Sequence, residues 1–234
     1  MNLVLHATGL HKRFGATVAL AGVDLQAAPG ESVGLVGPNG SGRSTLLRLL
    51  ATLIRPTSGT IELDGLDASR NLYEVRRRLA YVGDSVVPGH GLCARDYLTF
   101  LVNARSPRRA ARRTMVDDAL ARAGVTPDAD VDRMSGGNRR RVSLTAAFLL
   151  EPRVLLLDDP FSGLDVDARV AFSMWLSEVR DAGTTVVAAF HDEREVRTLC
   201  HRVVRLEGGR LGSTTPFAAS DVRRVPATAV TSVV

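Results

Sequence analysis

The chain has 234 residues, of which 45% are hydrophobic and 24% charged, and its formal net charge is +5 at pH 7. These are ordinary proportions for a globular protein of one large or two small domains, and no apolar run approaches the roughly 20 residues of a bilayer-spanning helix. The N-terminus lacks a signal-peptide pattern, and Cys93 and Cys200 lack metal-type spacing, so we expect the chain to stay in the cytoplasm.

Two segments near the N-terminus, residues 3–10 and 18–26, alternate in the manner of β-strands. The segment between them, residues 11–15, is predicted to be a loop that contains Phe14. An aromatic side chain at this position either fills a small core or offers a stacking surface for a purine ring. A turn at residues 28–30 leads into the next strand.

A glycine-rich loop follows the apolar run 33–36 and precedes a leucine-rich segment with helical spacing, residues 46–54. Although such a loop can be an ordinary turn, a strand, a glycine loop and a helix in that order favour a phosphate-binding loop, whose backbone N–H groups surround a phosphate. Lysine is usual where this chain has Arg43. The loop consists of Gly37, Pro38, Asn39, Gly40, Ser41, Gly42, Arg43, Ser44 and Thr45.

The middle of the chain begins with a turn at residues 55–59, which ends the first helix. We then expect a strand at 60–63, a helix at 71–78, a strand at 79–82 and helical structure from 93 to 124. A cluster of arginines within that last segment favours a solvated face, or else contact with a partner or with anionic headgroups. The cluster consists of Arg105, Arg108, Arg109, Arg112 and Arg113.

The second half of the chain alternates helices with buried strands. A helix begins at the Ser-Gly-Gly turn 135–137 and runs to residue 149, and the continuous apolar run 154–157 is typical of a strand buried on both faces. That strand leads into Asp158 and Asp159. The remaining expected elements are a helix at 165–181, a strand at 184–190 followed by His191, a helix near 193–200 and strands near 203–206 and 210–213.

This alternation predicts an α/β fold with a largely parallel sheet. Ligands of such sheets bind at the carboxyl ends of the strands. The glycine loop, the Asp158–Asp159 pair and His191 each follow a strand, so we expect them to meet at one edge of the sheet. Taken singly, the aspartates could form a strand-end turn and the histidine could be a core residue, but their joint spacing favours one site.

At these motifs the chain resembles the nucleotide-binding subunit of an ATP-binding cassette (ABC) transporter, over about residues 3–213. The glycine loop, the Ser-Gly-Gly-Asn turn 135–138 and the Ser-Gly-Leu-Asp segment 162–165 carry the likeness. The resemblance implies one domain, residues 1–234, with a P-loop NTPase core and mostly parallel sheet, an antiparallel β subdomain and an α-helical subdomain at about 85–152. The tail at about 215–234 has little pattern and is expected to be loosely held.

The resemblance also implies which residues bind ATP. Phe14 would stack on the adenine, and the loop 37–45 would bind the phosphates. Ser135, Gly136 and Gly137 would present a helix N-terminus to the γ-phosphate of ATP held by a partner cassette.

A second group of residues matches the catalytic and metal positions of the family. Asp159 stands where a glutamate polarises the attacking water, and His191 stands where a histidine senses the γ-phosphate. Asp84 stands where a glutamine ligates Mg²⁺ and couples to the membrane subunit. The residues implied to hold Mg²⁺ are Ser44, Asp84 and Asp158.

The implied partners are a separate transmembrane permease subunit and a second cassette, with the chain bound to the inner face of the cell membrane. Residues 55–66 and 197–211 look like the corresponding segments of exporters. The match to importers with C-terminal regulatory domains is poorer, because the chain ends soon after its last strand. The transported substrate is not indicated, since its contacts belong to the membrane subunit.

Three departures from the family pattern fall in one site: Arg43 for lysine, Asp84 for glutamine and Asp159 for glutamate. Asp159 is one methylene short, and a displacement of about 1 Å can cost about 10²-fold in rate. We therefore expect a site that binds ATP but hydrolyses it slowly, in a heterodimer with a competent cassette. Alternatively, Arg43 reflects a compositional bias, since Lys12 is the single lysine, and the chain is an ordinary homodimeric motor.

Two rival functions follow from other features. The pI near 10.0 favours a nucleic-acid machine of the same superfamily. However, residues 46–134, between the glycine loop and the Ser-Gly-Gly turn, lack the sustained heptads of DNA-repair relatives, so we expect no nucleic acid partner. The other rival is a cassette that uses ATP only to close a dimer and regulate a membrane protein, with negligible hydrolysis.

Overall fold

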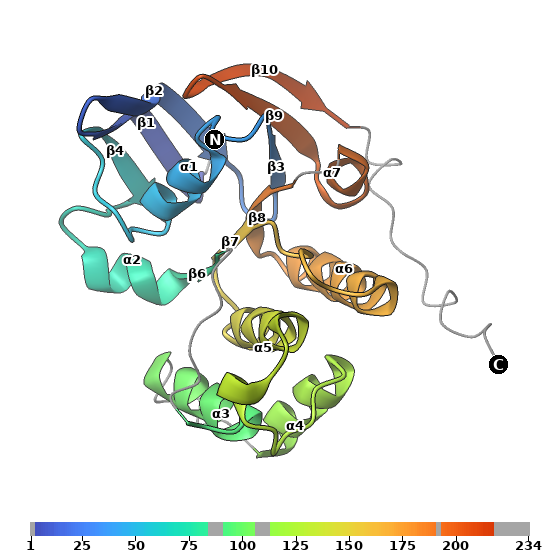
Figure 1. The fold of residues 1–234 in the computed structure, drawn as a ribbon. Coiled ribbons are helices and arrows are strands. Elements are labelled where there is room, and N and C mark those ends of the chain that lie inside the picture. Colours follow the sequence, from blue (N-terminus) through green and yellow to red (C-terminus); the bar gives the residue numbers. More distant parts are fainter. Residues whose placement is uncertain (1–2, 84–90, 106–112, 191–192, 218–234) are drawn as a thin grey trace.

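The computed structural model describes residues 3–83, 91–105, 113–190 and 193–217. Its strands form a four-stranded and a six-stranded sheet, and helices α3 (Ala94–Arg105), α4 (Arg113–Arg122) and α5 (Gly136–Leu149) form a separate group at the bottom of Figure 1. The strands are β1 (Leu5–Phe14), β2 (Thr17–Ala27), β3 (Ser32–Val36), β4 (Ser58–Leu63), β5 (Leu66–Asp67), β6 (Leu79–Val82), β7 (Val154–Asp158), β8 (Thr185–Ala189), β9 (Arg202–Glu207) and β10 (Arg210–Pro216). The helices are α1 (Arg43–Leu50), α2 (Leu72–Arg78), α3 (Ala94–Arg105), α4 (Arg113–Arg122), the 3₁₀ turn η1 (Val131–Arg133), α5 (Gly136–Leu149), α6 (Val166–Asp181) and α7 (Glu193–Leu199).

The six-stranded sheet has the order β10-β9-β3-β8-β7-β6. Its neighbours from β9 to β6 pair in parallel, and β10 pairs antiparallel with β9. Every residue of β3, β7 and β8 is buried. The prediction of a largely parallel sheet with strands covered on both faces is therefore confirmed.

The buried strand β7 separates two hydrophobic cores. Because successive side chains of a strand point to opposite faces, Val154 and Leu156 join the core that contains α1 and the four-stranded sheet. Leu155 and Leu157 join the core formed with the helices α3 to α6. Both faces of β7 therefore need apolar residues, which explains the unbroken hydrophobic run.

The four-stranded sheet has the order β2-β1-β4-β5 and is antiparallel. The predicted loop at residues 11–15 is wrong, because β1 continues to Phe14 and the chain turns at Gly15, which has φ +57°. Register shifts between Ala7 and Leu10 and again beyond Leu10 interrupt the pairing of β1 with β2. These β-bulges break the two-residue alternation, so the end of the strand cannot be recognised from hydrophobic periodicity.

Within the described residues, two helices occupy the segment 93–124, where the sequence predicts helical structure, and residues 106–112 between them lie outside the described residues. Helix α3 ends at Arg105 and α4 begins at Arg113. An ion-pair cluster fastens α3 to its surroundings, since Arg95 contacts Asp117 of α4 at 2.6 Å and also contacts Asp128.

The predicted arginine cluster is only partly a solvated face. Arg105 donates to the carbonyl oxygen of Leu79 and, at 3.3 Å, to that of Arg77. Burial and the nearby positive charge of Arg77 lower the pKa of Arg105. The Arg113 side chain is 76% exposed and lies 3.8 Å from a carboxylate oxygen of Asp117, as expected of a solvated position. The remaining members, Arg108, Arg109 and Arg112, lie outside the described residues.

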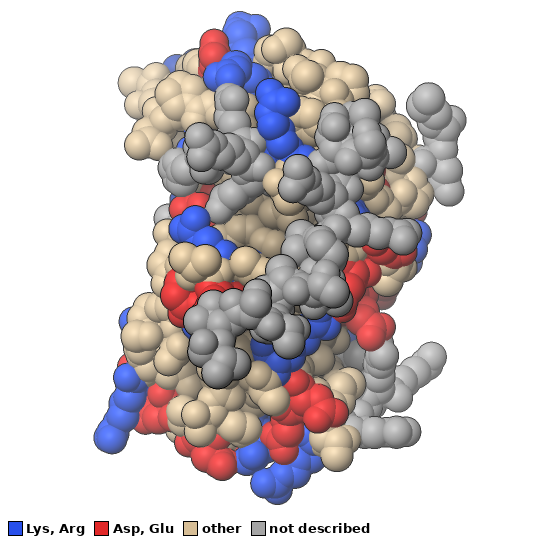
Figure 2. Space-filling view, turned by 90° about the vertical axis from the view of Figure 1, so that its right-hand side faces the viewer, with Lys and Arg blue, Asp and Glu red and all other residues tan. Residues whose placement is uncertain are grey.

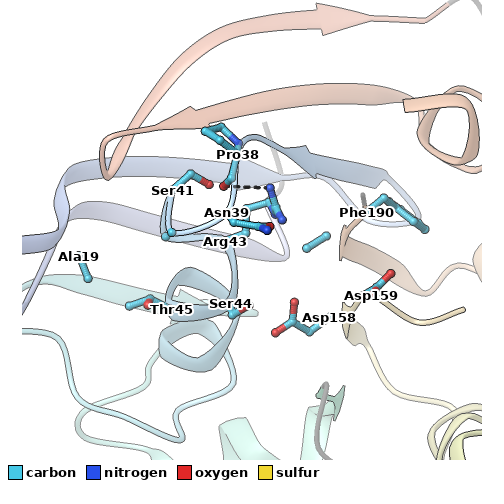
Figure 3. Close-up of a pocket in the computed structure, with 13 residues that line it drawn as sticks. Ala19, Pro38, Asn39, Ser41, Arg43, Ser44, Thr45, Asp158, Asp159 and Phe190 are labelled. Carbon is cyan, nitrogen blue, oxygen red and sulfur yellow. Dashed lines mark hydrogen bonds between the residues drawn. The ribbon is translucent and has the colours of Figure 1, made fainter. Parts of the chain in front are cut away.

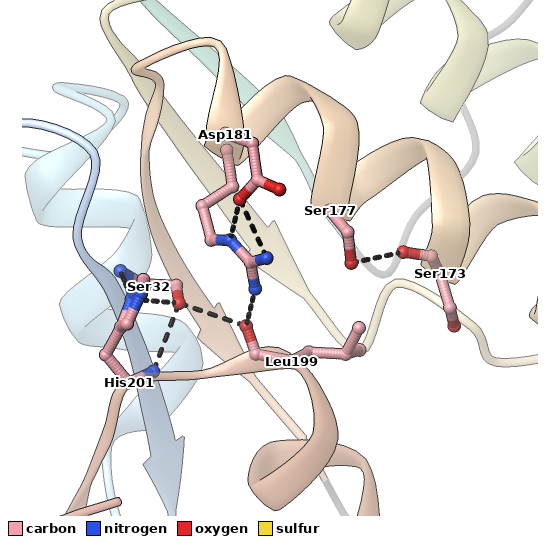
Figure 4. Close-up of polar contacts among 7 residues, drawn as sticks. Ser32, Ser173, Ser177, Asp181, Leu199 and His201 are labelled. Atoms are coloured by element: carbon pink, nitrogen blue, oxygen red, sulfur yellow. Dashed lines mark hydrogen bonds and ion pairs between the residues drawn. The ribbon is translucent and has the colours of Figure 1, made fainter. Parts of the chain in front are cut away.

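A polar network fixes the start of β3 to the start of β9 (Figure 4). The hydroxyl of Ser32 donates to the carbonyl oxygen of Leu199 at 3.0 Å and accepts from the backbone N–H of His201 at 3.1 Å. The backbone N–H of Ser32 donates to Nδ1 of His201 at 2.9 Å. Nδ1 therefore acts as an acceptor, which requires that this nitrogen carry no proton. Arg180 also donates to the Leu199 carbonyl, at 3.4 Å.

The face of the molecule in Figure 2 mixes charges of both signs. Figure 2 shows acidic and basic side chains in small alternating groups on the face it presents, with neutral residues between them. This distribution differs from the continuous basic stripe that is typical of nucleic-acid binding. Among the residues that the structure describes, none of the helices is long and apolar enough to cross a membrane.

Candidate functional site

The loop between β3 and α1 packs so closely against the backbone of β2 and β9 that two of its positions accept only glycine. A Cβ atom at Gly37 would lie 2.1 Å from the carbonyl oxygen of Leu206. At Gly42 it would lie 2.7 Å from the carbonyl oxygen of Ala19, and the backbone there has φ +107°. Larger residues would therefore push the loop away from β2 and β9.

A cavity of about 380 Å³ lies at the head of α1 (Figure 3). The glycine loop forms one wall, and the carboxyl ends of β7 and β8 form the other. The sequence prediction that these segments meet at one edge of the sheet is confirmed for the described residues. The lining consists of Ala19, Pro38, Asn39, Gly40, Ser41, Gly42, Arg43, Ser44, Thr45, Asp158, Asp159, Ala189 and Phe190.

The wall formed by the glycine loop suits an anion. Helix α1 has Gly42 as its N-cap, and its first turn begins with Arg43, Ser44 and Thr45, so the partial positive charge of its N-terminus faces the cavity without an acidic side chain. The hydroxyl of Ser41 is buried and, within the described chain, has no hydrogen-bond partner. An anionic group with several acceptor oxygens would satisfy these donors.

Arg43 lies across this loop. It is 9% exposed, and its Nη1 donates to the carbonyl oxygen of Pro38 at 3.3 Å (Figure 3). The guanidinium thus places a permanent positive charge in the cavity. A lysine would supply a more compact charge on a flexible stem, so the two residues are not equivalent here.

Two aspartates at the end of β7 supply the negative charge of the cavity. Asp158 is 4% exposed, and in Figure 3 its carboxylate lies on the side of Ser44. Asp159 has a left-handed backbone with φ +48°. Its N–H donates to the carbonyl oxygen of Ala189 at 3.0 Å, and its own carbonyl accepts from Arg140 at 3.1 Å.

The described part of the cavity offers a magnesium ion a few oxygen ligands but not a complete set of protein ligands. Among the described residues, no three His, Cys, Asp or Glu side chains form a metal-binding group. The hydroxyl of Ser44 and the carboxylate of Asp158 are oxygen ligands of the kind Mg²⁺ uses, and this ion commonly keeps several waters and takes its other ligands from phosphates. The residues present therefore fit a magnesium ion that accompanies a phosphorylated ligand.

The Ser-Gly-Gly turn lies outside the cavity. Ser135 is the N-cap of α5, and its hydroxyl accepts from the N–H of Asn138 at 3.3 Å. A Cβ atom at Gly137 would lie 2.7 Å from the carbonyl oxygen of Gly163, so the turn packs closely against the loop that follows Asp159. The structure thus separates Ser135, Gly136 and Gly137 from the glycine loop of the same chain.

Of the other three predicted site residues, the structure describes Phe14. Phe14 is 51% exposed, has the amino group of Lys12 4.9 Å from its ring centroid and does not line the cavity, so the alternative that it fills a small core is wrong. Asp84 and His191 lie outside the described residues.

Three residues at or near the site are absent from the sequence prediction. Ala19 and Phe190 line the cavity but are ordinary strand residues in the sequence. Arg140 reaches the site from α5 and is one of three consecutive arginines, so its position in the sequence carries no signal.

Comparison with known proteins gives a consistent result. A family model described as ABC transporter matches residues 20–162. The daunorubicin resistance ATP-binding protein DrrA3 of Streptomyces coeruleorubidus is 36% identical over 87% of this chain and 65% of its own length. The sulfate/thiosulfate import ATP-binding protein CysA of Mycobacterium bovis is 36% identical over 93% of this chain and 62% of its own length. The chain thus spans less than two thirds of the length of these relatives.

A shorter relative and two solved structures extend the comparison. A probable sulfate/thiosulfate import ATP-binding protein of Chlorella vulgaris is 36% identical over 86% of each chain. An ATP binding subunit of an ABC transporter aligns with a TM-score of 0.82 and 26% identity over 94% of this chain and 92% of that one. A dimeric bacterial ABC transporter cassette shares the fold, with a TM-score of 0.83 and 24% identity over 92% of this chain and 99% of that one. With its family match, its relatives and its fold in agreement, the chain belongs to the ABC transporter family, as an ATP-binding cassette.

Proposed function

We propose that this chain is the ATP-binding subunit of an ABC transporter and couples ATP binding and slow hydrolysis to export through a separate membrane subunit. The observation that carries the proposal is the cavity at the head of α1, where the glycine loop and Arg43 face Asp158. Positive donors and a carboxylate on opposite walls suit a phosphate chain that brings its own cation.

The residues of the cavity have distinct parts in binding. The amides of the loop 37–45 and the charge of Arg43 would hold the phosphates of ATP, and the exposed ring of Phe14 would stack on the adenine. Ser44 and Asp158 would hold Mg²⁺, together with Asp84, as the family resemblance implies. When bound, this ion neutralises phosphate charge.

The proposal of slow turnover rests on Asp159, the side chain that would orient the attacking water. Asp159 is a methylene shorter than the glutamate usual in the family, and a displacement of about 1 Å can cost about 10²-fold in rate. His191 would sense the γ-phosphate, as the family resemblance implies. Binding depends mainly on backbone amides and Mg²⁺, so it is expected to survive these departures better than the chemical step does.

The Ser-Gly-Gly turn supports a proposal of dimerisation. Because Ser135, Gly136 and Gly137 lie outside this chain's own cavity, they would close the ATP site of a second cassette. The preferred partner is a different, competent cassette, and a second copy of this chain is the alternative. The pair would dock from the cytoplasm on a membrane subunit, without nucleic acid.

Export remains part of the proposal on the strength of residues 55–66 and 197–211 alone. The relative named for daunorubicin resistance and the one named for sulfate import are both 36% identical to this chain. Sequence identity to these two relatives therefore favours neither export nor import.

Calorimetry with Mg-ATP tests the proposed binding. We expect saturable binding below about 1 mM for the wild type, and a loss of at least about tenfold in affinity for Arg43→Ala, since a charge-assisted contact contributes about 1.5–3 kcal/mol. The matched control is Arg70→Ala, whose side chain is 84% exposed, contacts Asp67 and does not line the cavity. Absence of binding by the wild type at near-millimolar nucleotide would contradict the proposal.

A phosphate-release assay tests the proposed slow turnover. The isolated chain is expected to hydrolyse ATP more slowly than about 1 s⁻¹, the low end of ordinary enzymatic rates. Turnover at or above that rate without a partner cassette would contradict slow hydrolysis and favour the ordinary homodimeric motor.

A second candidate is a regulatory cassette that uses ATP only to close a dimer. Arg43 and Asp159 favour it, because both change the chemistry of the site while retaining charge. Binding of Mg-ATP without measurable phosphate release, even in the presence of a partner cassette, would distinguish this function from a slow motor.

A further inference from the structure

The side chain of Arg140 connects α5 to the carboxyl ends of the neighbouring strands β6 and β7. It is 5% exposed, and its guanidinium donates to the carbonyl oxygen of Gly83, directly after β6, and at 3.1 Å to the carbonyl oxygen of Asp159, directly after β7. A planar fork with several donors in fixed directions can hold two acceptors at once. Arg140 therefore fixes the spacing of these strand ends.

Of the two residues whose carbonyls Arg140 holds, Asp159 lines the cavity and has a carboxylate, whereas Gly83 does not line it. The left-handed backbone of Asp159, φ +48°, is an unfavourable conformation for a non-glycine residue and persists only where neighbouring contacts hold it. Here the N–H is held by the Ala189 carbonyl at 3.0 Å, and the carbonyl is held by Arg140 and by the N–H of Ser162 at 3.3 Å.

We propose that Arg140 is a positioning residue for the carboxylate of Asp159. The direction of the Cα–Cβ bond depends on the backbone dihedral angles, so a guanidinium that holds the Asp159 peptide also sets where its carboxylate points. This inference rests on the proposed function, because it assigns Arg140 to the step in which Asp159 would orient water. It adds a residue that does not itself line the cavity.

The position of Arg140 on α5 extends its effect to the Ser-Gly-Gly turn. Arg140 follows Gly136, the first residue of α5, by one helical turn, and Ser135 caps the same helix. A nucleotide bound to a facing cassette would contact the Ser-Gly-Gly turn, and a shift of that turn would move the first helical turn of α5 with it. Arg140 would transmit that movement to the peptide of Asp159, whose carbonyl it holds.

A double-mutant cycle on the full chain tests the inference. Single-turnover hydrolysis of Mg-ATP is measured for the wild type, Arg140→Ala, Asp159→Ala and the double variant, and nucleotide affinity is measured by calorimetry. We expect Arg140→Ala to lower the rate at least about tenfold, as a misplaced catalytic group does, while the Kd for Mg-ATP changes by less than about twofold. In the Asp159→Ala background, the same substitution is expected to have no further effect on the rate.

Two further variants separate positioning from a structural role. Arg140→Lys, which keeps the charge but can hold one carbonyl at a time, is expected to restore part of the rate. Arg133→Ala, at a side chain that is 87% exposed, serves as the control with unchanged rate and affinity. If Arg140→Ala does not fold, as judged from Trp175 fluorescence, Arg140→Gln takes its place in the cycle with the same criteria.

The outcomes distinguish this inference from the proposed function. A wild type that fails to bind Mg-ATP overturns the proposed function and the inference with it. A wild type that binds and hydrolyses ATP, with Arg140→Ala as fast as the wild type, overturns the inference alone. A loss of rate that persists in the Asp159→Ala background also overturns it, because Arg140 then acts by another route.

Discussion

At the scale of residues, the chemistry of the cavity depends on how far two side chains reach. Arg43 folds back onto the carbonyl of Pro38, and Asp159 projects from a left-handed backbone. In both cases the charge usual in the family is present, but its distance from the backbone differs. We therefore expect substitutions that change length at constant charge to alter rate more than affinity.

Replacing Asp159 by glutamate tests this expectation. Asp159→Glu extends the carboxylate by one methylene and is expected to raise kcat at least about tenfold, within the roughly 10²-fold range of a 1 Å correction. The Kd for Mg-ATP is expected to stay within about twofold, since backbone amides dominate binding. Phosphate release under saturating nucleotide measures the effect. The matched control is Asp167→Glu in the first turn of α6, and an unchanged kcat for Asp159→Glu would place the limitation elsewhere.

The residues of the site differ in how far sequence can predict them. Gly37 and Gly42 follow from the spacing of the loop, and the structure gives the reason, since a Cβ atom at either position would meet backbone oxygens. Asp158 follows from its place after a buried strand. Phe190 and Arg140 could not be predicted, because their relevance depends on which strand ends the fold brings together.

At the scale of elements, the buried strands and the helices between them are predictable because both faces of the sheet are covered. The run 154–157 corresponds to β7, and the predicted helix 165–181 corresponds to α6. The end of β1 is missed because bulges break its alternation. Contacts between helices, such as that between α4 and α6, cannot be predicted from a local sequence pattern, because they join segments far apart in the chain.

Arg122 of α4 makes such a contact. It lies 4.6 Å from the ring of Trp175 on α6 and forms two hydrogen bonds of 2.7 Å with Glu178. The ion pair is partly exposed, so Arg122→Ala is expected to lower the free energy of unfolding by only about 1 kcal/mol. Urea denaturation followed by Trp175 fluorescence measures it. The double variant with Glu178→Ala is expected to lose less than the sum of the two single variants, and full additivity would contradict the pairing.

The junction of β3 with β9 makes stability depend on pH. Burial, with a further contribution from Arg180, lowers the pKa of His201 below its usual 6.5. The unfolded chain therefore binds a proton at higher pH than the folded chain, so this contribution to stability is present above about pH 6.5 and is lost as the pH falls through the lowered value. Urea midpoints measured from pH 7.5 to 5 should decrease accordingly.

His201→Asn separates this effect from other titrating groups. The Asn side-chain oxygen can accept from the Ser32 N–H in place of Nδ1 but does not titrate. We expect the variant to show a shallower decrease than the wild type over the same range. His11→Asn, at an exposed position, serves as the control, and equal slopes for His201→Asn and the wild type would contradict the assignment.

At the scale of the whole molecule, the two hydrophobic cores share the strands of one sheet. The side chains of β7 and β8 enter both cores, with Val186 and Ala188 on one side and Val187 and Ala189 on the other. Separating the cores would expose strands that are buried along their full length. The predicted single domain therefore implies that the helical part and the nucleotide cavity lose their structure together.

Nucleotide-linked unfolding tests this cooperativity, because its probes report on different parts of the chain. Trp175 lies against the core that contains the helices, whereas Mg-ATP would bind at the head of α1, beside the other core. We expect one thermal transition, identical by Trp175 fluorescence and far-UV circular dichroism. Mg-ATP at about 100 times its Kd should raise the melting temperature by about 5–10 °C in both signals, since such binding contributes about 2.7 kcal/mol. Arg43→Ala should reduce both shifts equally. A shift confined to the dichroism signal would mean that the helical part unfolds independently of the nucleotide cavity, because stabilisation then does not reach Trp175.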